Sequence, residues 1–329
     1  TLAPEPFYLP KDKELVSASL SPKGDFMLIA ITEPQSWRDE GDIMPNYISE
    51  DGRVKSENVR RRVADAKPVE HQLVLLNLSD GSQSTLTYNT LSGWNEDVLA
   101  EVKRENHEAR GETYKSEEKP RPITLMADWG WENGAIQWNE EGTEVAVMLE
   151  AWDNKDRWLA TVDTAGKKLV SQDRLHDDAW INYTHNEFGW LDSDELWFMS
   201  EADGYSHLYV KPLDGSTRQL TDGSYVVEDA DLSSNGDYLY FQANIEHPGI
   251  YEVYRVKTDG SGDPEALTDL DGMTAFELSP EDDELLLTHS TPLMPPELYH
   301  KSVNASGTAE RLTHTVSEKF LSIDWTAPE

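Results

Sequence analysis

A pattern of hydrophobic and polar positions recurs along the chain at intervals of about 45 residues. Each copy opens with a small or apolar residue and a Leu or Trp, passes through a short polar turn, and ends in a run of apolar residues. Copies occupy residues 18–29, 136–147, 188–198, 230–241 and 276–287. Apolar runs on both sides of a turn predict two antiparallel strands in each copy.

A second pattern follows the first in the same order. It consists of a strand, a turn rich in Asp, Gly or Ser, and a short strand that closes on Leu-Thr. It occupies residues 71–87, 207–221, 251–268 and 297–313. Asp-Gly between apolar runs favours a type I′ turn, which needs positive φ at both central residues. Such pairs stand at Asp80-Gly81, Asp214-Gly215 and Asp259-Gly260.

Two hairpins in each repeat, at a fixed period, predict an all-β fold of the β-propeller class with four-stranded antiparallel blades. Five complete blades can be counted. The phrase at 321–325 has the form of a sixth opening strand, which suggests one part of a seven- or eight-bladed propeller. We expect residues 1–329 to form a single propeller domain or part of one.

Two inserts interrupt the early repeats, at about 37–69 and 97–122. The first is polar and carries Arg60, Arg61 and Arg62. The second has an N-cap candidate and helical spacing ahead of a stretch rich in Lys and Pro, so it predicts a helix. Loops at the rim of such a fold are where recognition surfaces usually lie.

Composition narrows the function classes. The sequence holds 28 Lys and Arg against 63 Asp and Glu, a net charge of −35, and this field repels nucleic acid and anionic membrane surfaces. There is no cysteine, and the nine histidines show no metal-binding spacing, so we expect no metal site and no cofactor. His207 and His300 lie in equivalent strands of two repeats, where we expect packed, hydrogen-bonded side chains. The Asp-rich segments 259–263 and 268–272 are interpreted as turns rather than cation sites.

The segment 198–209, which reads Phe-Met-Ser-Glu-Ala-Asp-Gly-Tyr-Ser-His-Leu-Tyr, resembles the propeller of the prolyl oligopeptidase family of serine peptidases. The likeness is to its dipeptidyl-peptidase-IV-like and acylaminoacyl-peptidase-like branches. The signature residues are Ser200, Glu201, Asp203, Gly204, Tyr205, His207 and Tyr209. Residues 296–304 look like the last propeller blade of the same family. The resemblance implies a domain that gates and orients short peptides for a separate α/β-hydrolase domain, expected downstream in the parent protein.

The chain itself lacks the family's chemistry. A nucleophile elbow needs Gly-x-Ser-x-Gly, and no such run is present, so no catalytic residue is assigned. The dipeptidyl-peptidase-IV branch holds the substrate's amino terminus with adjacent glutamates, and residues 128–135 contain no such pair. That role is therefore not transferred to any residue here.

The candidate substrate-binding residues are Arg60, Arg61, Arg62, Trp129 and Trp131. An arginine can bind a peptide carbonyl or carboxylate, and paired tryptophans can form a stacking surface. The alternative functional hypothesis is a stand-alone scaffold resembling TolB-type periplasmic propellers, which bind other proteins. Homo-oligomerisation is left open, and a bacterial periplasmic or secreted location is favoured over the cytoplasm.

Overall fold

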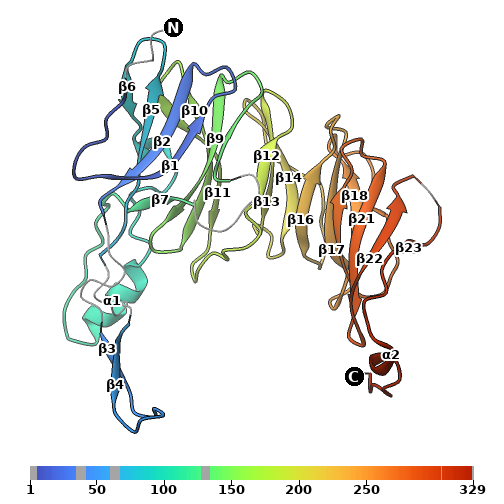
Figure 1. Ribbon diagram of the computed structural model, residues 1–329. Helices are drawn as coiled ribbons and strands as arrows, with labels where there is room; N and C mark the ends of the chain where they lie inside the picture. The colour runs from blue at the N-terminus through green and yellow to red at the C-terminus, as the bar shows by residue number, and fades with distance from the viewer. Residues whose placement is uncertain (1–5, 35–41, 60–66, 127–133, 305, 328–329) are drawn as a thin grey trace. The chain divides into compact units, whose positions relative to one another are not determined.

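The computed structural model describes residues 6–34, 42–59, 67–126, 134–304 and 306–327. The chain divides into two compact units, Thr1–Ile181 (unit 1) and Asn182–Glu329 (unit 2). Almost all of the regular structure is antiparallel β-sheet (Figure 1). Within the described ranges, no helix is long and apolar enough to cross a membrane.

Unit 1 contains two blade-like sheets and a separate hairpin. The first sheet has the order β1-β2-β5-β6, with β1 (Glu14–Leu20), β2 (Phe26–Thr32), β5 (Gln72–Asn77) and β6 (Gln83–Thr85). The second has the order β11-β10-β9-β7, and β8 also pairs with β9. Its strands are β7 (Ile123–Leu125), β8 (Ile136–Trp138), β9 (Glu144–Ala151), β10 (Asp156–Asp163) and β11 (Lys168–His176). The remaining elements are β3 (Ile43–Asn46), β4 (Lys55–Asn58), the 3₁₀ turn η2 (Tyr88–Thr90) and α1 (Ala100–Glu108).

Unit 2 contains three further groups of four strands. The first has the order β12-β13-β14-β15, with β12 (Phe188–Trp190), β13 (Glu195–Ser200), β14 (His207–Pro212) and β15 (Arg218–Gln219). The second consists of β16 (Val227–Leu232), β17 (Tyr238–His247), β18 (Ile250–Lys257) and β19 (Glu265–Ala266). The third consists of β20 (Met273–Leu278), β21 (Glu284–Thr291), β22 (Met294–Ser302) and β23 (Glu310–Arg311), and a single parallel bridge joins β18 to β20. The short helix α2 (Glu318–Leu321) follows.

The sequence of each strand reflects its place in the sheet. The central strands β2 and β9 are apolar along most of their length and are buried on both faces. The outer strands β15, β19 and β23 have two residues each and are largely exposed. A short outer strand presents few unpaired backbone groups, and this limits edge-to-edge association. The opening strands β1, β8, β12, β16 and β20 confirm the strands predicted from the first repeated phrase.

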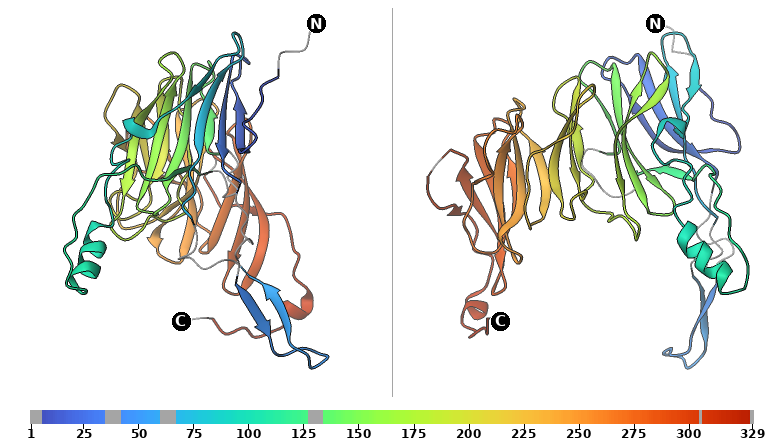
Figure 2. Two further views of the ribbon diagram at one scale, coloured as in Figure 1. Left: turned by 90° about the vertical axis from the view of Figure 1, so that its left-hand side faces the viewer. Right: turned by 180° about the vertical axis from the view of Figure 1, so that it is seen from behind.

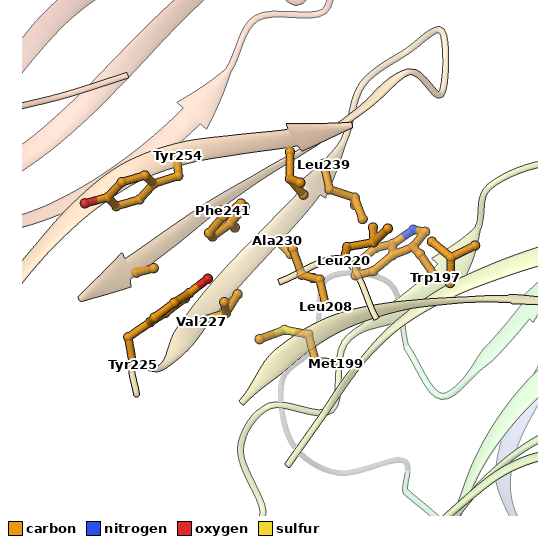
Figure 3. Packing of buried hydrophobic residues seen from close by; sticks show 13 residues of the cluster. Trp197, Met199, Leu208, Leu220, Tyr225, Val227, Ala230, Leu239, Phe241 and Tyr254 are labelled. Atoms are coloured by element: carbon orange, nitrogen blue, oxygen red, sulfur yellow. The ribbon is translucent and has the colours of Figure 1, made fainter. Parts of the chain in front are cut away.

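The largest buried cluster of unit 2 lies between the strands β13–β14 and β16–β18 (Figure 3). Met199 and Leu208 of one sheet pack with Val227, Ala230 and Phe241 of the next. Burying a side chain such as Leu208 stabilises the fold by about 2 kcal/mol. The members of the cluster are Trp197, Met199, Leu208, Val210, Leu220, Tyr225, Val227, Ala230, Leu239, Phe241, Ala243, Tyr254 and Val256.

The predicted turn type is wrong at all three Asp-Gly pairs. Only Gly81 and Gly260 have positive φ, at 73° and 74°, and Gly215 does not. None of the three aspartates has positive φ, and the carboxylates of Asp80 and Asp259 accept backbone amides two residues ahead. Asp80 accepts the amide of Ser82 at 2.8 Å, and Asp259 accepts that of Ser261 at 2.7 Å. Such side-chain-to-backbone bonds stabilise wider turns that need one glycine in the left-handed region.

Two further predictions are wrong: the strand at 321–325 and a side-chain cap at the start of the helix in the second insert. The phrase 321–325 is not a strand, because Leu321 is the last residue of α2 and its amide donates to the Ser317 carbonyl at 3.1 Å. Helix α1 confirms the helix predicted in the second insert, but its N-cap is Leu99, which makes no side-chain cap bond. The carboxylate of Asp97 instead accepts from Lys103 at 2.5 Å and from Ser116 at 3.0 Å.

A pH dependence of stability is expected from Glu144, which lies opposite Asp163 across β9 and β10. Burial and the Asp163 charge raise the pKa of Glu144 to about 7. The folded state then keeps a proton that the unfolded chain loses above its ordinary pKa near 4.5, so stability falls as the pH rises from about 4.5 through 7. Glu144 is about half buried, so after discounting for solvent screening the effect is about 1 kcal/mol.

Chemical denaturation of E144Q should therefore show a gain of about 1 kcal/mol over the unmodified protein at pH 8 and no gain at pH 4. The exposed Glu140 in the neighbouring turn supplies the control variant, E140Q, which should track the unmodified protein at both pH values. Equal stability of E144Q and E140Q at pH 8 would contradict the proposed burial effect.

Candidate functional site

The signature segment forms the hairpin between β13 and β14. His207 is completely buried, with Nδ1 at 3.0 Å from the Thr221 hydroxyl and Nε2 at 3.1 Å from the Gly223 carbonyl. Because a carbonyl only accepts, Nε2 donates in the second contact. Tyr225 packs edge-on against the imidazole, with ring centroids 4.9 Å apart. These contacts confirm the prediction that His207 is a packed, hydrogen-bonded residue.

The other signature residues shape the same hairpin. Gly204 has φ of 100°, a region that favours glycine, and its amide donates to the Glu201 carbonyl at 3.0 Å. Asp203 accepts the Tyr205 amide at 3.2 Å and the Gln219 side chain at 2.6 Å. Ser200 is buried at the end of β13, Tyr209 stacks on Phe198 at 5.5 Å, and Tyr205 is partly exposed. The signature thus builds a turn and the packing beside it.

His207 has structural counterparts in the next two sheets. Tyr209, Tyr254 and Tyr299 occupy the same register against the short outer strands. In each sheet, the residue two positions before this tyrosine contacts the threonine of the Leu-Thr pair that ends the repeat. We call these contacts the closing-threonine pairs: His207 with Thr221, Glu252 with Thr268, and Glu297 with Thr313. In each pair the threonine hydroxyl also accepts a hydrogen bond, at 2.9–3.0 Å, from the backbone amide of the residue that follows the histidine or glutamate.

The two glutamates of these pairs are saturated with donors. Glu252 accepts the amides of Leu270 and Asp271, both at 2.8 Å, and this holds the Asp-rich loop as a turn. Glu297 accepts the Thr315 amide at 2.7 Å and the Arg311 guanidinium at 2.9 Å. The bond from Thr313, with those from Thr315 and Arg311, lowers the pKa of Glu297 to about 2 although burial opposes the shift. Both carboxylates therefore serve the fold rather than a ligand.

His300, which the sequence placed in an equivalent strand to His207, lies in a different environment. Its side chain is 44% exposed, and its Nε2 lies 2.6 Å from a carboxylate oxygen of Glu284. The strands β14 and β22 are equivalent, but the register shows that the position of His207 corresponds to Glu297. His300 is therefore a surface residue, and the prediction that it is packed like His207 is wrong.

Unit 1 contains a network of charged side chains around Asp156, whose side chain is completely buried at the start of β10. Arg121 approaches Asp156 at 2.5 Å and binds Asp153 with two bonds, at 2.6 and 2.9 Å. Arg174 contacts Asp156 at 2.6 Å and Glu96 at 2.7 Å. Burial alone would lower the pKa of Arg121, but Asp153 and Asp156 raise it above its ordinary value. Such bidentate pairs fix the geometry of both partners.

The network fastens the second insert to the sheet. Arg121 donates to the Gly93 carbonyl at 3.0 Å, and its guanidinium lies 5.6 Å from the ring of the buried Trp158. A Cβ at Gly93 would lie 2.2 Å from the guanidinium carbon of Arg174, and its φ of 74° favours glycine. Trp158 in turn donates to the Ser92 carbonyl at 2.8 Å. Gly93 is therefore required for the close approach of Arg174.

Two cavities of unit 1 share Pro120 and Arg121 in their walls. One, of about 420 Å³, is lined by charged and polar groups that include Asp97, Lys103 and Tyr114. The other, of about 680 Å³, includes Lys13, His71, Tyr88 and Trp94. Burial, together with the charge of Glu70, raises the pKa of Tyr88, so its hydroxyl stays protonated and donates to the His71 carbonyl at 2.6 Å. Both cavities therefore have charged and polar side chains in their walls.

Comparisons with known proteins identify the fold. Residues 133–296 match the family described as the dipeptidyl peptidase IV (DPP IV) N-terminal region. The crystal structure of Porphyromonas gingivalis dipeptidyl peptidase 4 is similar over 91% of this chain and 37% of that one, with a TM-score of 0.61 and 15% identity. A putative dipeptidyl aminopeptidase IV from Bacteroides ovatus is similar over 92% of this chain and 43% of that one, with a TM-score of 0.58 and 14% identity.

Residues 133–296 are therefore similar to the N-terminal region of dipeptidyl peptidase IV, and the chain has a dipeptidyl-peptidase-IV-like propeller fold. The matched region runs from just before β8 into β22 and includes the whole signature segment, so the resemblance drawn from that segment is confirmed. The β-propeller class is confirmed as well. The chain spans well under half the length of the two similar peptidase structures.

The predicted substrate-binding residues of this dipeptidyl-peptidase-IV-like propeller lie outside the described residues. Arg60, Arg61 and Arg62 fall in 60–66, and Trp129 and Trp131 fall in 127–133. They stay predictions. Of two other tryptophans, Trp158 is completely buried, whereas Trp180 is 61% exposed.

Sequence reasoning missed the Asp156 network. Its members come from five places, namely the segment just before the second insert (Glu96), the end of that insert, the turn before β10, β10 itself and β11. Asp156 and His176 are opposite each other across β10 and β11, so a hairpin prediction for this segment could have suggested a charged pair. The contact between Arg121 and Asp156 joins the insert to β10, and no local spacing in the sequence indicates it.

Proposed function

We propose that this dipeptidyl-peptidase-IV-like propeller gates and orients short peptide substrates for hydrolysis by an α/β-hydrolase domain of the same parent protein. The chain itself supplies no nucleophile in this proposal. It limits access by size and holds part of the peptide by polar contacts. The observation that carries the proposal is the family match over residues 133–296.

Two further observations support it. The similar structures are named as a dipeptidyl peptidase and a putative dipeptidyl aminopeptidase, and this chain is similar to less than half of each. Those proteins therefore have room for further domains beyond the part that resembles this chain. In unit 1, the second insert is fixed by Arg121 and Asp156 next to two cavities, as expected of a recognition loop that must keep its shape.

The test uses the full-length protein with aminoacyl-, acylaminoacyl- and dipeptidyl-p-nitroanilides and a serine-reactive phosphonate probe. We expect turnover of at least one substrate class and labelling outside residues 1–329. The class that is turned over defines the specificity, since residues 128–135 lack the glutamate pair. If the full-length protein neither turns over a substrate nor becomes labelled, the peptidase proposal fails and the TolB-like scaffold takes its place.

Gating is tested separately by substrate size. The full-length protein should cleave a peptide of about five residues with a kcat/KM at least 100-fold higher than that for an unstructured polypeptide of about 60 residues carrying the same cleavable sequence. Since both substrates carry the same cleavable sequence, a difference in kcat/KM reports how easily each substrate reaches the active site. Equal kcat/KM values would leave the peptidase activity intact and remove the gating role.

The arginine run of the first insert supplies a prediction about orientation. If one of Arg60, Arg61 and Arg62 binds a peptide carbonyl or carboxylate, its alanine variant should raise KM about tenfold with kcat nearly unchanged, because a charged hydrogen bond contributes about 1.5 kcal/mol. Arg53→Ala, on the same insert, is the matched control and should leave KM unchanged. Three variants with ordinary KM values would exclude these arginines from substrate binding.

A further inference from the structure

The segment 267–272, which we call the crossover, leads from β19 to β20 and joins two neighbouring sheets of unit 2. The strands of both sheets, drawn in shades of orange, lie side by side and share a buried cluster (Figures 1 and 2). The carboxylate of Glu252 on β18 accepts the amides of Leu270 and Asp271, both at 2.8 Å, and the hydroxyl of Thr268. One buried carboxylate therefore fixes the shape of the crossover.

A histidine of the following sheet reaches the same carboxylate through a threonine. His289 on β21 and Thr274 on β20 are opposite each other in the ladder, and both are buried. Nδ1 of His289 lies 2.9 Å from the Thr274 hydroxyl, which lies 3.4 Å from Oε2 of Glu252. Because a carboxylate only accepts, the order of donation that satisfies all three groups runs from His289 to Thr274 to Glu252. A neutral imidazole with its proton on Nδ1 meets this requirement.

The His289 ring also lies against the backbone of the crossover. A Cβ at Gly272 would lie 2.7 Å from Cε1 of His289 and 2.2 Å from the Ser290 carbonyl oxygen, so only glycine fits there. The Gly272 carbonyl accepts the Tyr251 amide at 2.7 Å, next to the single bridge that joins the two sheets. The ring therefore cannot gain a shell of water while the crossover keeps this position.

Four titratable groups face His289 among the described residues. Glu252 on β18 and Asp271 in the crossover carry charges that favour the protonated ring. On β22, Glu297 is opposite His289 in the ladder, and Tyr299 packs edge-on against the ring, with centroids 5.5 Å apart. Burial outweighs the two carboxylates and lowers the pKa of His289 below its ordinary value of 6.5.

We propose that His289 is an acid-sensitive latch, which keeps the crossover closed while the imidazole is neutral and releases it when the imidazole is protonated. In the closed state the ring donates to Thr274 and lies against Gly272. An added proton favours states in which the ring is in contact with water, and such states require the crossover to leave the ring. The hydrogen bonds of the crossover to Glu252 then open together with the contact at Gly272. This proposal does not depend on the proposed peptidase function.

The direction of the pH dependence follows from the lowered pKa of His289. The open state has the ordinary pKa of 6.5, and the closed state has a lower one. The closed state is therefore favoured fully above pH 6.5, and this preference is lost as the pH falls from 6.5 toward the lower value. Local opening of this kind is separate from global unfolding and can be followed by hydrogen exchange.

The test is amide hydrogen exchange of the full-length protein, measured by mass spectrometry on peptides that cover the crossover and divided by the intrinsic exchange rates. We expect the resulting opening constant to be about tenfold larger at pH 5 than at pH 7.5. His289→Gln keeps a donor for Thr274 but cannot be protonated, so it should remove this difference. His300→Gln, on the exposed histidine of β22, is the matched control and should retain the difference.

A second measurement needs only the unmodified protein. Deuterium exchange at Cε1 of each histidine, read by mass spectrometry, gives the midpoint of its titration, and we expect that of His289 to lie below 6.5. The proposal is overturned if the opening constant of the crossover is equal at pH 5 and 7.5, if H289Q retains the difference, or if the His289 midpoint is 6.5 or higher.

Discussion

Replacing Asp156 with alanine is expected to lower the free energy of unfolding by about 3–5 kcal/mol. Its side chain is completely buried and lies 2.5 Å from Arg121 and 2.6 Å from Arg174. Removing it leaves two largely buried guanidinium groups without their shared carboxylate, and the cost of an unpaired buried charge exceeds the value of the pair itself. Chemical denaturation followed by tryptophan fluorescence measures the change, since Trp158 packs against Arg121.

The control for D156A is Arg104→Ala. Arg104 lies on α1 in the same insert, is 54% exposed, and contacts Glu101 at 3.7 Å. Loss of such a surface pair should change stability by less than about 0.5 kcal/mol. A combined R121M/D156A variant should lose less than the sum of the two single changes, because the residues are in direct contact. Equal small effects of D156A and R104A would show that the network does not hold the insert.

His207→Ala is expected to cost about 3 kcal/mol. The substitution leaves a cavity next to Tyr225 and removes partners from the Thr221 hydroxyl and the Gly223 carbonyl. Because the Thr221 hydroxyl also accepts the Leu208 amide at 3.0 Å, the closing strand should loosen together with the signature hairpin. Hydrogen exchange of the Leu208 and Leu220 amides, which lie at this junction, measures that local effect.

His300→Ala provides the comparison for H207A, since it removes the same side chain from the equivalent strand of another blade. His300 is 44% exposed and its ion pair is with Glu284, which is itself 42% exposed, so the loss of His300 should cost less than about 1 kcal/mol. If H207A were no more destabilising than H300A, the signature histidine would not be a structural residue. Its presence in the signature would then require a role in binding.

Much of the fold could be predicted because each repeat consists of apolar runs and polar turns that are close together along the sequence. Central strands such as β2 and β9 are apolar along most of their length since both faces are covered, and this can be read directly from the sequence. The signature segment was enough to indicate the family because its turn needs Gly204 and its strand needs a buried His207 and Tyr209. These are constraints between residues that are close along the chain.

The candidate site was less accessible to sequence reasoning. Arginines and tryptophans were chosen for their chemistry in loops, and both groups fall outside the described residues. The exposed hairpin of the first insert was expected only as a polar loop, since its strands have four residues each and a proline. Short strands with mixed composition give no clear period.

The sequence by itself determined the blade repeat, the strand order within each blade, the helix of the second insert and the family, because each depends on local periodicity or a contiguous motif. Only the tertiary structure decided that Arg121, Asp156 and Arg174 meet, that Glu252 and Glu297 replace His207 in the closing-threonine pairs, and that residues 318–321 form a helix. The contacts among Arg121, Asp156 and Arg174 join residues that are separated along the chain, and their energy depends on burial and distance, which no local pattern encodes.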